Sequence, residues 1–284
     1  MGRVILLHAE QGFGDTLEFA RYAPLVERLG ARVLLEVQPP LKRLMGTLPF
    51  AGEIYAQGDT LPAFDFQCPL LSLPLAFGTV VATIPWEGAY LSAEESRLHR
   101  WQRRLGEGTL PRIGLVWSGS FDPQKSHLGR SILLEAFGEL LSLPVEWVCL
   151  QKEIGAGDRA ALPRFKRLRQ FSDEIDDFTD TAALIACCDL VISIDTAVAH
   201  LAGAMGKPVW VLLPYVPDWR WLLDREDCPW YPTARLFRQP RFGDWVSVVQ
   251  AICKQLHACV CHKSNPHMLA MQSTQDVMLS PAAR

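Results

Sequence analysis

The polar residues with the clearest spacing follow one apolar run, Leu190–Ile194. Asp195 and Thr196 come directly after it, and His200 lies one helical turn beyond Thr196, on the same face. In open α/β sheets, ligands bind at the carboxyl ends of the strands, where the N–H groups of a helix amino terminus can hold a diphosphate. The backbone of Thr196, Ala197 and the next residue is therefore a candidate diphosphate site. Alternatively, Asp195 or Thr196 is a plain helix cap and His200 a core histidine.

A second candidate site lies in the turn that follows the first apolar run, residues 4–7. The turn contains Gly12 and Gly14, but Leu17 stands where a dinucleotide fingerprint needs its third glycine. Asp15 at the helix start would also repel a pyrophosphate. These residues favour an acceptor site, in which the Asp15 carboxylate could take a proton from a hydroxyl group. The alternative is that Asp15 only caps the helix.

Small residues and cations form a third candidate site. Ser118 and Gly119 follow a predicted strand, and a turn of small residues lets a ligand approach the backbone. Lys125 and Arg130 come next along the chain, and such cations can neutralise a leaving diphosphate. Lys152, after the following predicted strand, would point to the same edge of a sheet. For all three cations the alternative is an ordinary solvated side chain.

Several other motifs are absent or ambiguous. The sequence has no Walker lysine loop, no His-Glu-x-x-His motif and no Gly-x-Ser-x-Gly elbow. The acidic run 173–177 is typical of a solvated loop, and Cys259-Val-Cys-His262 has no second ligand pair nearby. We therefore expect no metal and no bound cofactor. The aromatic loop 214–221 could form the wall of a base or sugar site, or simply pack between domains.

The elements that would position these residues alternate between strand and helix. The first half is expected to form strands at 4–7, Arg32–Val37, Glu53–Ala56 and 64–67, and helices at 15–29 and 93–105, with Pro24 kinking or splitting the first helix. The second half is expected to form strands at 112–117, 145–150, 168–171, Leu190–Ile194 and Val209–Leu213, and helices at 131–141, from 160, at 181–187, 196–205 and 245–256. Near-continuous apolar strands in this order predict parallel sheets covered on both faces.

A glycine-rich linker at 106–111 separates the two halves. We expect an α/β fold of two Rossmann-like domains facing across a cleft, residues 1–107 on the acceptor side and 110–256 on the nucleotide side. Residues 257–284 lack periodicity and are expected to form a disordered tail.

Composition excludes several classes of function. Of the 284 residues, 49% are hydrophobic and 21% charged, a globular balance, and the net charge of −3 comes with scattered Lys and Arg, so no nucleic-acid partner is expected. The eight cysteines do not have the spacing of a small secreted domain. No apolar run approaches the roughly 18 residues of a membrane span. We expect a soluble, cytoplasmic protein without a transmembrane segment.

Residues 195–208 read Asp-Thr-x-x-x-His-Leu-Ala-x-Ala-x-Gly-x-Pro. This pattern closely resembles the donor-binding segment of the heptosyltransferase family (glycosyltransferase family 9), with Ala197 where that family often has glycine. Asp15 matches the aspartate proposed as general base in the family, and Arg130, with Lys125 second, fits its basic residue before the helix. The resemblance covers about residues 3–256 and is strongest to the transferase domain that bacteria attach to tetratricopeptide arrays.

The resemblance implies a GT-B fold and an inverting, metal-independent transfer of a sugar from a nucleoside-diphosphate sugar to an acceptor hydroxyl. The acceptor is a glycan, a lipid-linked group or a protein, and an acceptor-recruiting tetratricopeptide array is expected outside this chain. Two other readings stay open. One is a nucleotide-sugar epimerase or hydrolase of the same fold, and the other is a non-catalytic nucleotide-binding module, which the altered loop at 120–130 favours.

Overall fold

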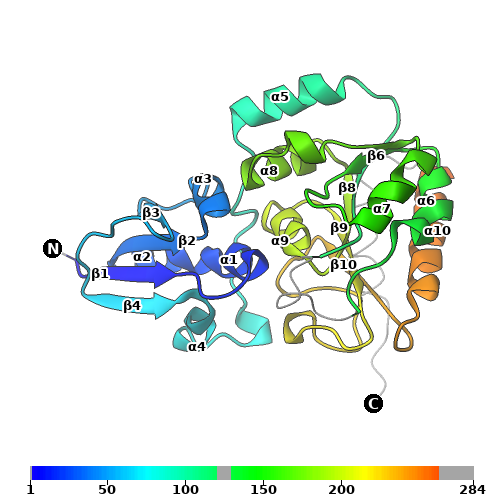
Figure 1. Ribbon diagram of the computed structural model, residues 1–284. Coiled ribbons are helices and arrows are strands. Elements are labelled where there is room, and N and C mark those ends of the chain that lie inside the picture. Colours follow the sequence, from blue (N-terminus) through cyan, green and yellow to red (C-terminus); the bar gives the residue numbers. More distant parts are fainter. Residues whose placement is uncertain (1, 120–128, 262–284) are drawn as a thin grey trace, which may run out of the picture.

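The computed structural model describes residues 2–119 and 129–261. The strands of this part of the chain form two sheets, one from each half of the sequence, which lie side by side with helices around them (Figure 1). The strand orders are β3-β2-β1-β4 and β10-β9-β8-β5-β6-β7, and every pairing within them is parallel. The α/β prediction with parallel sheets is confirmed.

The first sheet contains β1 (Val4–His8), β2 (Arg32–Val37), β3 (Glu53–Ala56) and β4 (Phe66–Pro69). The predicted helix at 15–29 is divided into α1 (Phe13–Phe19), a 3₁₀ turn, and α2 (Ala23–Arg28). Pro24 occupies the first turn of α2, where its missing N–H removes no helical hydrogen bond. The expected split at this proline is therefore confirmed. Short helices α3 (Lys42–Met45) and α4 (Leu73–Ala76) complete this half.

The second sheet contains β5 (Arg112–Val116), β6 (Glu146–Cys149), β7 (Leu168–Arg169), β8 (Leu190–Ile194), β9 (Val209–Leu213) and β10 (Ala234–Arg238). Every residue of β8 and β9 is buried, which explains their continuous apolar sequences. β10 was not predicted, because Arg235 and Arg238 interrupt its apolar pattern. It is an edge strand whose alternate side chains are only partly buried.

The helices of the second half are α6 (Gly138–Ser142), α7 (Ala156–Ala161), α8 (Phe178–Ala186), α9 (Ala197–Ala204) and α10 (Trp245–Cys261). The continuous helix expected at 131–141 is wrong. The chain forms a 3₁₀ turn, Leu134–Phe137, and becomes α-helical only from Gly138. The prediction of a tail from residue 257 is wrong for 257–261, because α10 continues there and Val260 packs on the second apolar core. Residues 262–284 lie outside the described residues.

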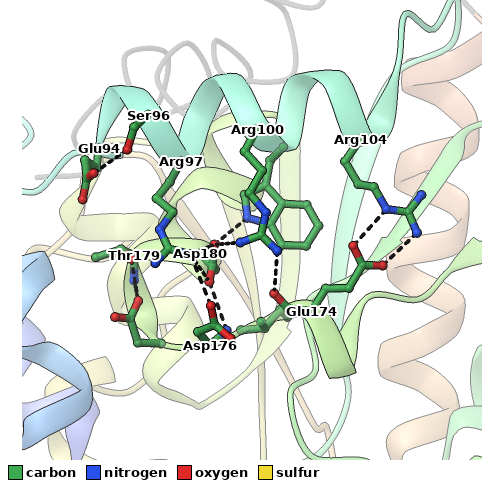
Figure 2. A network of polar contacts seen from close by, with 12 residues as sticks. Glu94, Ser96, Arg97, Arg100, Arg104, Glu174, Asp176, Thr179 and Asp180 are labelled. Atoms are coloured by element: carbon green, nitrogen blue, oxygen red, sulfur yellow. Dashed lines mark hydrogen bonds and ion pairs between the residues drawn. The ribbon is translucent and has the colours of Figure 1, made fainter.

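Helix α5 (Glu95–Leu105) precedes the expected linker but packs on α8 of the second half (Figures 1 and 2). Its buried Trp101 donates from Nε1 to Asp180 at 2.9 Å, and Arg97 donates to the same carboxylate at 3.1 Å. Arg104 forms a two-pronged ion pair with Glu174, at 2.9 and 2.7 Å. The division of the chain at residues 107–110 stays a prediction, since this helix joins both halves.

One apolar cluster contains buried side chains from both sheets, including Leu7 and Leu35 of the first and Val211 of the second. Helices α1 and α9 pack against each other within it. Arg21, which is buried in the same region, donates to the Trp230 carbonyl at 2.8 Å. The two halves therefore share a continuous interior beside the predicted site residues.

Candidate active site

A cavity of about 500 Å³ lies at the carboxyl ends of β8, β9 and β10. Its lining includes Arg130, Asp195, Asp218, Gln239, Phe242 and Trp245. This is the edge at which open parallel sheets bind their ligands. Of the residues predicted to bind the donor, Arg130 and Asp195 are thus brought together at one cavity.

Asp195 orients the cation of this pair. Its side chain is almost fully buried, and its Oδ2 lies 3.5 Å from Arg130 Nη1. Burial alone would raise the pKa of Asp195, but the charges of His200, Arg130 and Arg220 lower it below its ordinary value. An ionised Asp195 would repel a phosphate, whereas the Arg130 guanidinium beside it would attract one.

Thr196 is the N-cap residue of α9, with an extended backbone (φ −144°, ψ 169°). Its Oγ1 pairs with Ser193 Oγ at 3.0 Å, and in the described structure no side chain caps the first turn of the helix. The N–H groups of Ala197 and Val198 belong to that turn, and both residues are partly exposed. The backbone is thus arranged as a diphosphate site requires, next to Asp195.

His200 is buried between α1 and α9 and is not among the residues that line the cavity. Its Nδ1 is 3.0 Å from the Tyr231 hydroxyl, and its Nε2 is 3.8 Å from Asp195 Oδ1. A Cβ atom placed on Gly14 would come within 2.8 Å of the His200 ring. These contacts are those of the core-histidine alternative, with Asp195 linking the ring to the cavity.

Asp15 has a different partner on each oxygen. Oδ2 accepts the N–H of Gly12 at 2.9 Å, which is the capping contact expected at the start of α1. Oδ1 accepts from Arg220 Nη2 at 2.6 Å, across the junction between the two halves. The Asp15 carboxylate thus caps α1 and also forms an ion pair with Arg220. This ion pair lies near the cavity, because Arg220 also contacts Asp218, which lines the cavity.

Arg220 and Glu18 are residues of this site that the sequence analysis did not single out. Arg220 is largely buried, and its guanidinium faces three carboxylates, those of Asp15, Glu18 and Asp218; the last two lie 3.2 Å from Nε. Burial alone would lower the pKa of Arg220, but the three carboxylates raise it above its usual range. The guanidinium therefore carries a permanent charge at the junction.

Glu18 is fully buried one turn after Asp15 on α1. Its Oε2 lies 3.2 Å from Arg220 Nε and 3.7 Å from His200 Nδ1, and neither carboxylate oxygen is hydrogen-bonded within the described residues. Burial raises the pKa of Glu18, against the lowering effect of His200, Arg220 and Arg21. In the sequence, the signal for a buried carboxylate was a glutamate placed between two apolar residues, Leu17 and Phe19.

Gln151, which follows β6, holds the turn after β5 by hydrogen bonds. Ser118 donates its N–H to Gln151 Oε1 at 3.2 Å, and its carbonyl accepts from Gln151 Nε2 at 2.9 Å. Gly119 donates its N–H to Ser131 Oγ at 3.1 Å, and Ser131 also lines the cavity. The predicted small-residue turn therefore lies next to the cavity wall.

Of the two predicted lysines, Lys152 is described and is not among the residues that line the cavity. Lys152 Nζ donates to the carbonyls of Ile175 and Asp176, the second at 3.2 Å, so it holds the loop before α8. Lys125 lies outside the described residues. Within 2–119 and 129–261, no three His, Cys, Asp or Glu side chains are grouped so that they could hold a metal ion. None of the described helices is long and apolar enough to cross a membrane.

Comparisons with known proteins find similarity in one segment of the sequence and in the fold. The family model of glycosyltransferase family 9 (heptosyltransferase) matches residues 177–216, which contain α8, β8, α9 and β9. Protein FlbA of Caulobacter vibrioides is 26% identical over 276 residues, covering 86% of this chain and 44% of FlbA. The chain thus spans less than half the length of this curated relative.

Two solved structures have the same fold. The Escherichia coli ADP-heptose lps heptosyltransferase II matches with a TM-score of 0.61 at 15% identity, covering 93% of this chain and 100% of that one. The family 9 glycosyl transferase of Veillonella parvula matches with a TM-score of 0.64 at 11% identity, covering 92% of this chain and 98% of that one.

The fold defines the class: this is a GT-B glycosyltransferase fold, with a cavity at the carboxyl ends of three strands of its second sheet. Within that class, the resemblance to glycosyltransferase family 9, the heptosyltransferases, is confirmed by the family model at the α8–β9 segment and by the structural matches.

Proposed function

We propose that this chain is an inverting, metal-independent glycosyltransferase that moves a sugar from a nucleoside-diphosphate sugar to an acceptor hydroxyl. One observation carries the proposal. Arg220 contacts Asp15 of the first half and also Asp218, which lines the cavity of the second half. A potential base and a potential donor site thus share one charged group.

The donor side is residues 110–256 in this proposal, and the acceptor side is residues 1–107. The diphosphate would bind the N–H groups at the start of α9, with Arg130 neutralising its charge. Arg130 suits this task because Asp195 already orients it at the cavity. Ser118 and Gly119 would border the same ligand, whereas Lys152 would first have to leave its two carbonyl partners.

The transfer step needs a base on the face of the sugar opposite the diphosphate. As the acceptor oxygen bonds to the anomeric carbon, its proton passes to the Asp15 carboxylate. The bond between the anomeric carbon and the diphosphate oxygen breaks, and its electron pair leaves with the nucleoside diphosphate. Direct displacement of this kind inverts the anomeric carbon. Arg130 and the α9 amides would stabilise the departing charge without a metal ion.

Only the similar proteins indicate which donor and which acceptor to test first. The similar Escherichia coli protein is named an ADP-heptose lps heptosyltransferase, so ADP and ADP-heptose are the first probes. The acceptor would be a glycan, a lipid-linked group or a protein. Because the chain spans 44% of FlbA, we propose that a segment outside it, such as a tetratricopeptide array, recruits the acceptor. We also propose a cytoplasmic location.

Turnover with ADP-heptose, UDP-glucose and GDP-mannose tests the proposal, with release of nucleoside diphosphate measured with and without a mixture of glycan and peptide acceptors. The proposal predicts release that depends on an acceptor and yields an inverted linkage. Release without any acceptor would instead support a hydrolase. Conversion of the donor to an isomer would support an epimerase, and binding without turnover would support a non-catalytic module.

A further inference from the structure

Gln239 stands at the carboxyl end of β10, where its N–H extends the ladder to β9 by donating to the Leu213 carbonyl at 3.0 Å. Its side chain is 5% exposed. The Oε1 atom accepts two backbone N–H groups, from Tyr215 and Gly243, each at 3.1 Å. Because an amide oxygen accepts and an amide nitrogen donates, these two contacts fix which end of the side chain is which.

The other end of this amide is a donor with no acceptor among residues 2–119 and 129–261. Nε2 is buried, and within the described residues it has no hydrogen-bond partner. A buried donor left unpaired is costly, and native proteins keep few of them without a reason. Gln239 is one of the residues that line the cavity, so a ligand that binds beside its amide can supply the acceptor that the described residues do not.

The neighbours of Gln239 narrow the chemistry of that ligand. Asp218 adds a carboxylate to the cavity wall, and the 84% exposed ring of Phe242 adds an apolar face at its rim. Asp218 would repel a phosphate but accepts hydrogen bonds from hydroxyl groups. An amide donor, a carboxylate acceptor and an aromatic face together complement a sugar ring, which has hydroxyls on its rim and C–H groups on its face.

We propose that Gln239 and Asp218 form a sugar-recognition subsite in the donor-side cavity, with Gln239 Nε2 donating to a ring hydroxyl or ring oxygen. This inference rests on the proposed function and deepens it, because it assigns the part of the substrate that this wall of the cavity recognises. The sugar comes from the donor or from a glycan acceptor; both present the same hydroxyl-rich ring.

Gln239→Glu tests the subsite with little change of shape. One glutamate oxygen can still accept the N–H groups of Tyr215 and Gly243, while the other presents an acceptor where the ligand expects a donor. Gln239→Met removes both functions and keeps the length of the side chain. Gln102→Glu makes the same chemical change on the exposed surface of α5 and serves as the control.

The donor arm compares each free nucleotide with its sugar conjugate by calorimetry at pH 8, using ADP with ADP-heptose, UDP with UDP-glucose and GDP with GDP-mannose. We expect both Gln239 variants to bind the free nucleotide as the wild type does and to bind the preferred conjugate about tenfold more weakly. The acceptor arm repeats the comparison with free monosaccharides in the presence of the nucleotide, observed by saturation-transfer NMR. If the variants lose affinity only for the free monosaccharides, the subsite binds the acceptor sugar.

Both readouts measure binding, so the subsite can stand even if the chain turns over no donor and the proposed reaction fails. Equal weakening of the free nucleotide and its conjugate would overturn the subsite and make this a base site. The idea is also overturned if both variants bind every probe like the wild type, or if the wild type binds no sugar-bearing probe. Melting curves of the three variants show whether each one is folded.

Discussion

Asp15 Oδ1 accepts a hydrogen bond from Arg220 Nη2 at 2.6 Å, although the two residues are 205 positions apart in the chain. The contact joins the start of α1 to the loop after β9. Glu18 and Asp218 face the same guanidinium, so a single cation is shared by carboxylates of both halves. A group that belongs to the acceptor side in the proposed reaction is thereby fixed next to the donor-side cavity.

Replacing Asp15 with Asn should abolish transfer while preserving nucleotide binding. The amide keeps an oxygen that can accept the Gly12 N–H, but it cannot take a proton from the acceptor. We expect the rate of transfer to fall by at least about a hundredfold, the usual size of a general-base effect. Steady-state turnover measures the rate and calorimetry the nucleotide affinity. Asp59→Asn, which breaks an exposed ion pair with Lys42, is the control. Undiminished turnover by the Asp15 variant would remove this residue as the base.

Glu18→Gln should change the pH dependence of stability. Burial raises the pKa of Glu18 in the folded protein, so the folded state holds its proton more tightly than the unfolded state does. The stability that this group contributes is present below its ordinary pKa of 4.5 and is lost as pH rises through the higher folded value.

The glutamine variant should therefore gain stability relative to the wild type as pH rises above about 4.5, despite losing the charge beside His200, Arg220 and Arg21. Urea unfolding at a series of pH values between 4 and 8 measures the difference. If instead the wild type became more stable relative to the variant as pH rises, the attraction of the cations for the Glu18 carboxylate would outweigh the cost of burying its charge.

Asp180→Asn should strongly destabilise the contact between α5 and α8. The Asp180 carboxylate is fully buried and accepts a hydrogen bond from Trp101 Nε1. It also accepts one from Arg97 (Figure 2). Removing one partner of a buried charged contact costs about 3–5 kcal/mol, because the other charge stays desolvated. Glu174→Gln, which breaks the more exposed pair with Arg104, should cost about 1 kcal/mol or less. Urea unfolding measures both variants. If both lost the same free energy of unfolding, the buried network would contribute no more stability than the surface pair.

Gly14→Ala should loosen the packing of α1 on α9. The added methyl group would lie 2.8 Å from the His200 ring, so the helices must move apart, at a cost of about 1–3 kcal/mol. Gly157 is a matched control, since a methyl group there has no neighbour within 4 Å, and its replacement by alanine should leave stability unchanged or raise it by up to about 1 kcal/mol. Thermal unfolding of both variants makes the comparison, and similar melting points would contradict the close approach.

Two partly exposed strands, Arg32–Val37 and Glu53–Ala56, and two fully buried strands were predicted with their observed bounds. The buried strands, Leu190–Ile194 and Val209–Leu213, could be predicted because a strand covered on both faces is apolar at every position. β10 was missed, since an edge strand can keep arginines at alternate positions. The end of α10 was misplaced because residues 257–261 continue a helix whose apolar face packs on the second core.

The candidate site was predicted only in part, for a related reason. Asp195 could be predicted because it directly follows a buried strand, at a known edge of the sheet, and Arg130 because it matches a basic residue of the family that the sequence resembles. Glu18 and Arg220 were missed, because the contacts of Arg220 with Asp15 and Glu18 join residues more than 200 positions apart and nothing local indicates such a pairing. Lys152 also follows a strand, but its flexible chain reaches the carbonyls of a neighbouring loop.

The central claim is that the cavity at β8, β9 and β10 holds a nucleoside diphosphate. The most direct measurement is calorimetric titration with ADP, UDP, GDP and CDP in the absence of metal, on the wild type and on Arg130→Ala. We predict that one of the four binds with a dissociation constant below a millimolar and that the alanine variant loses about 1.5–3 kcal/mol of affinity, the usual size of a hydrogen bond to a charged group. Failure of all four to bind, or equal affinity in the variant, would contradict the account.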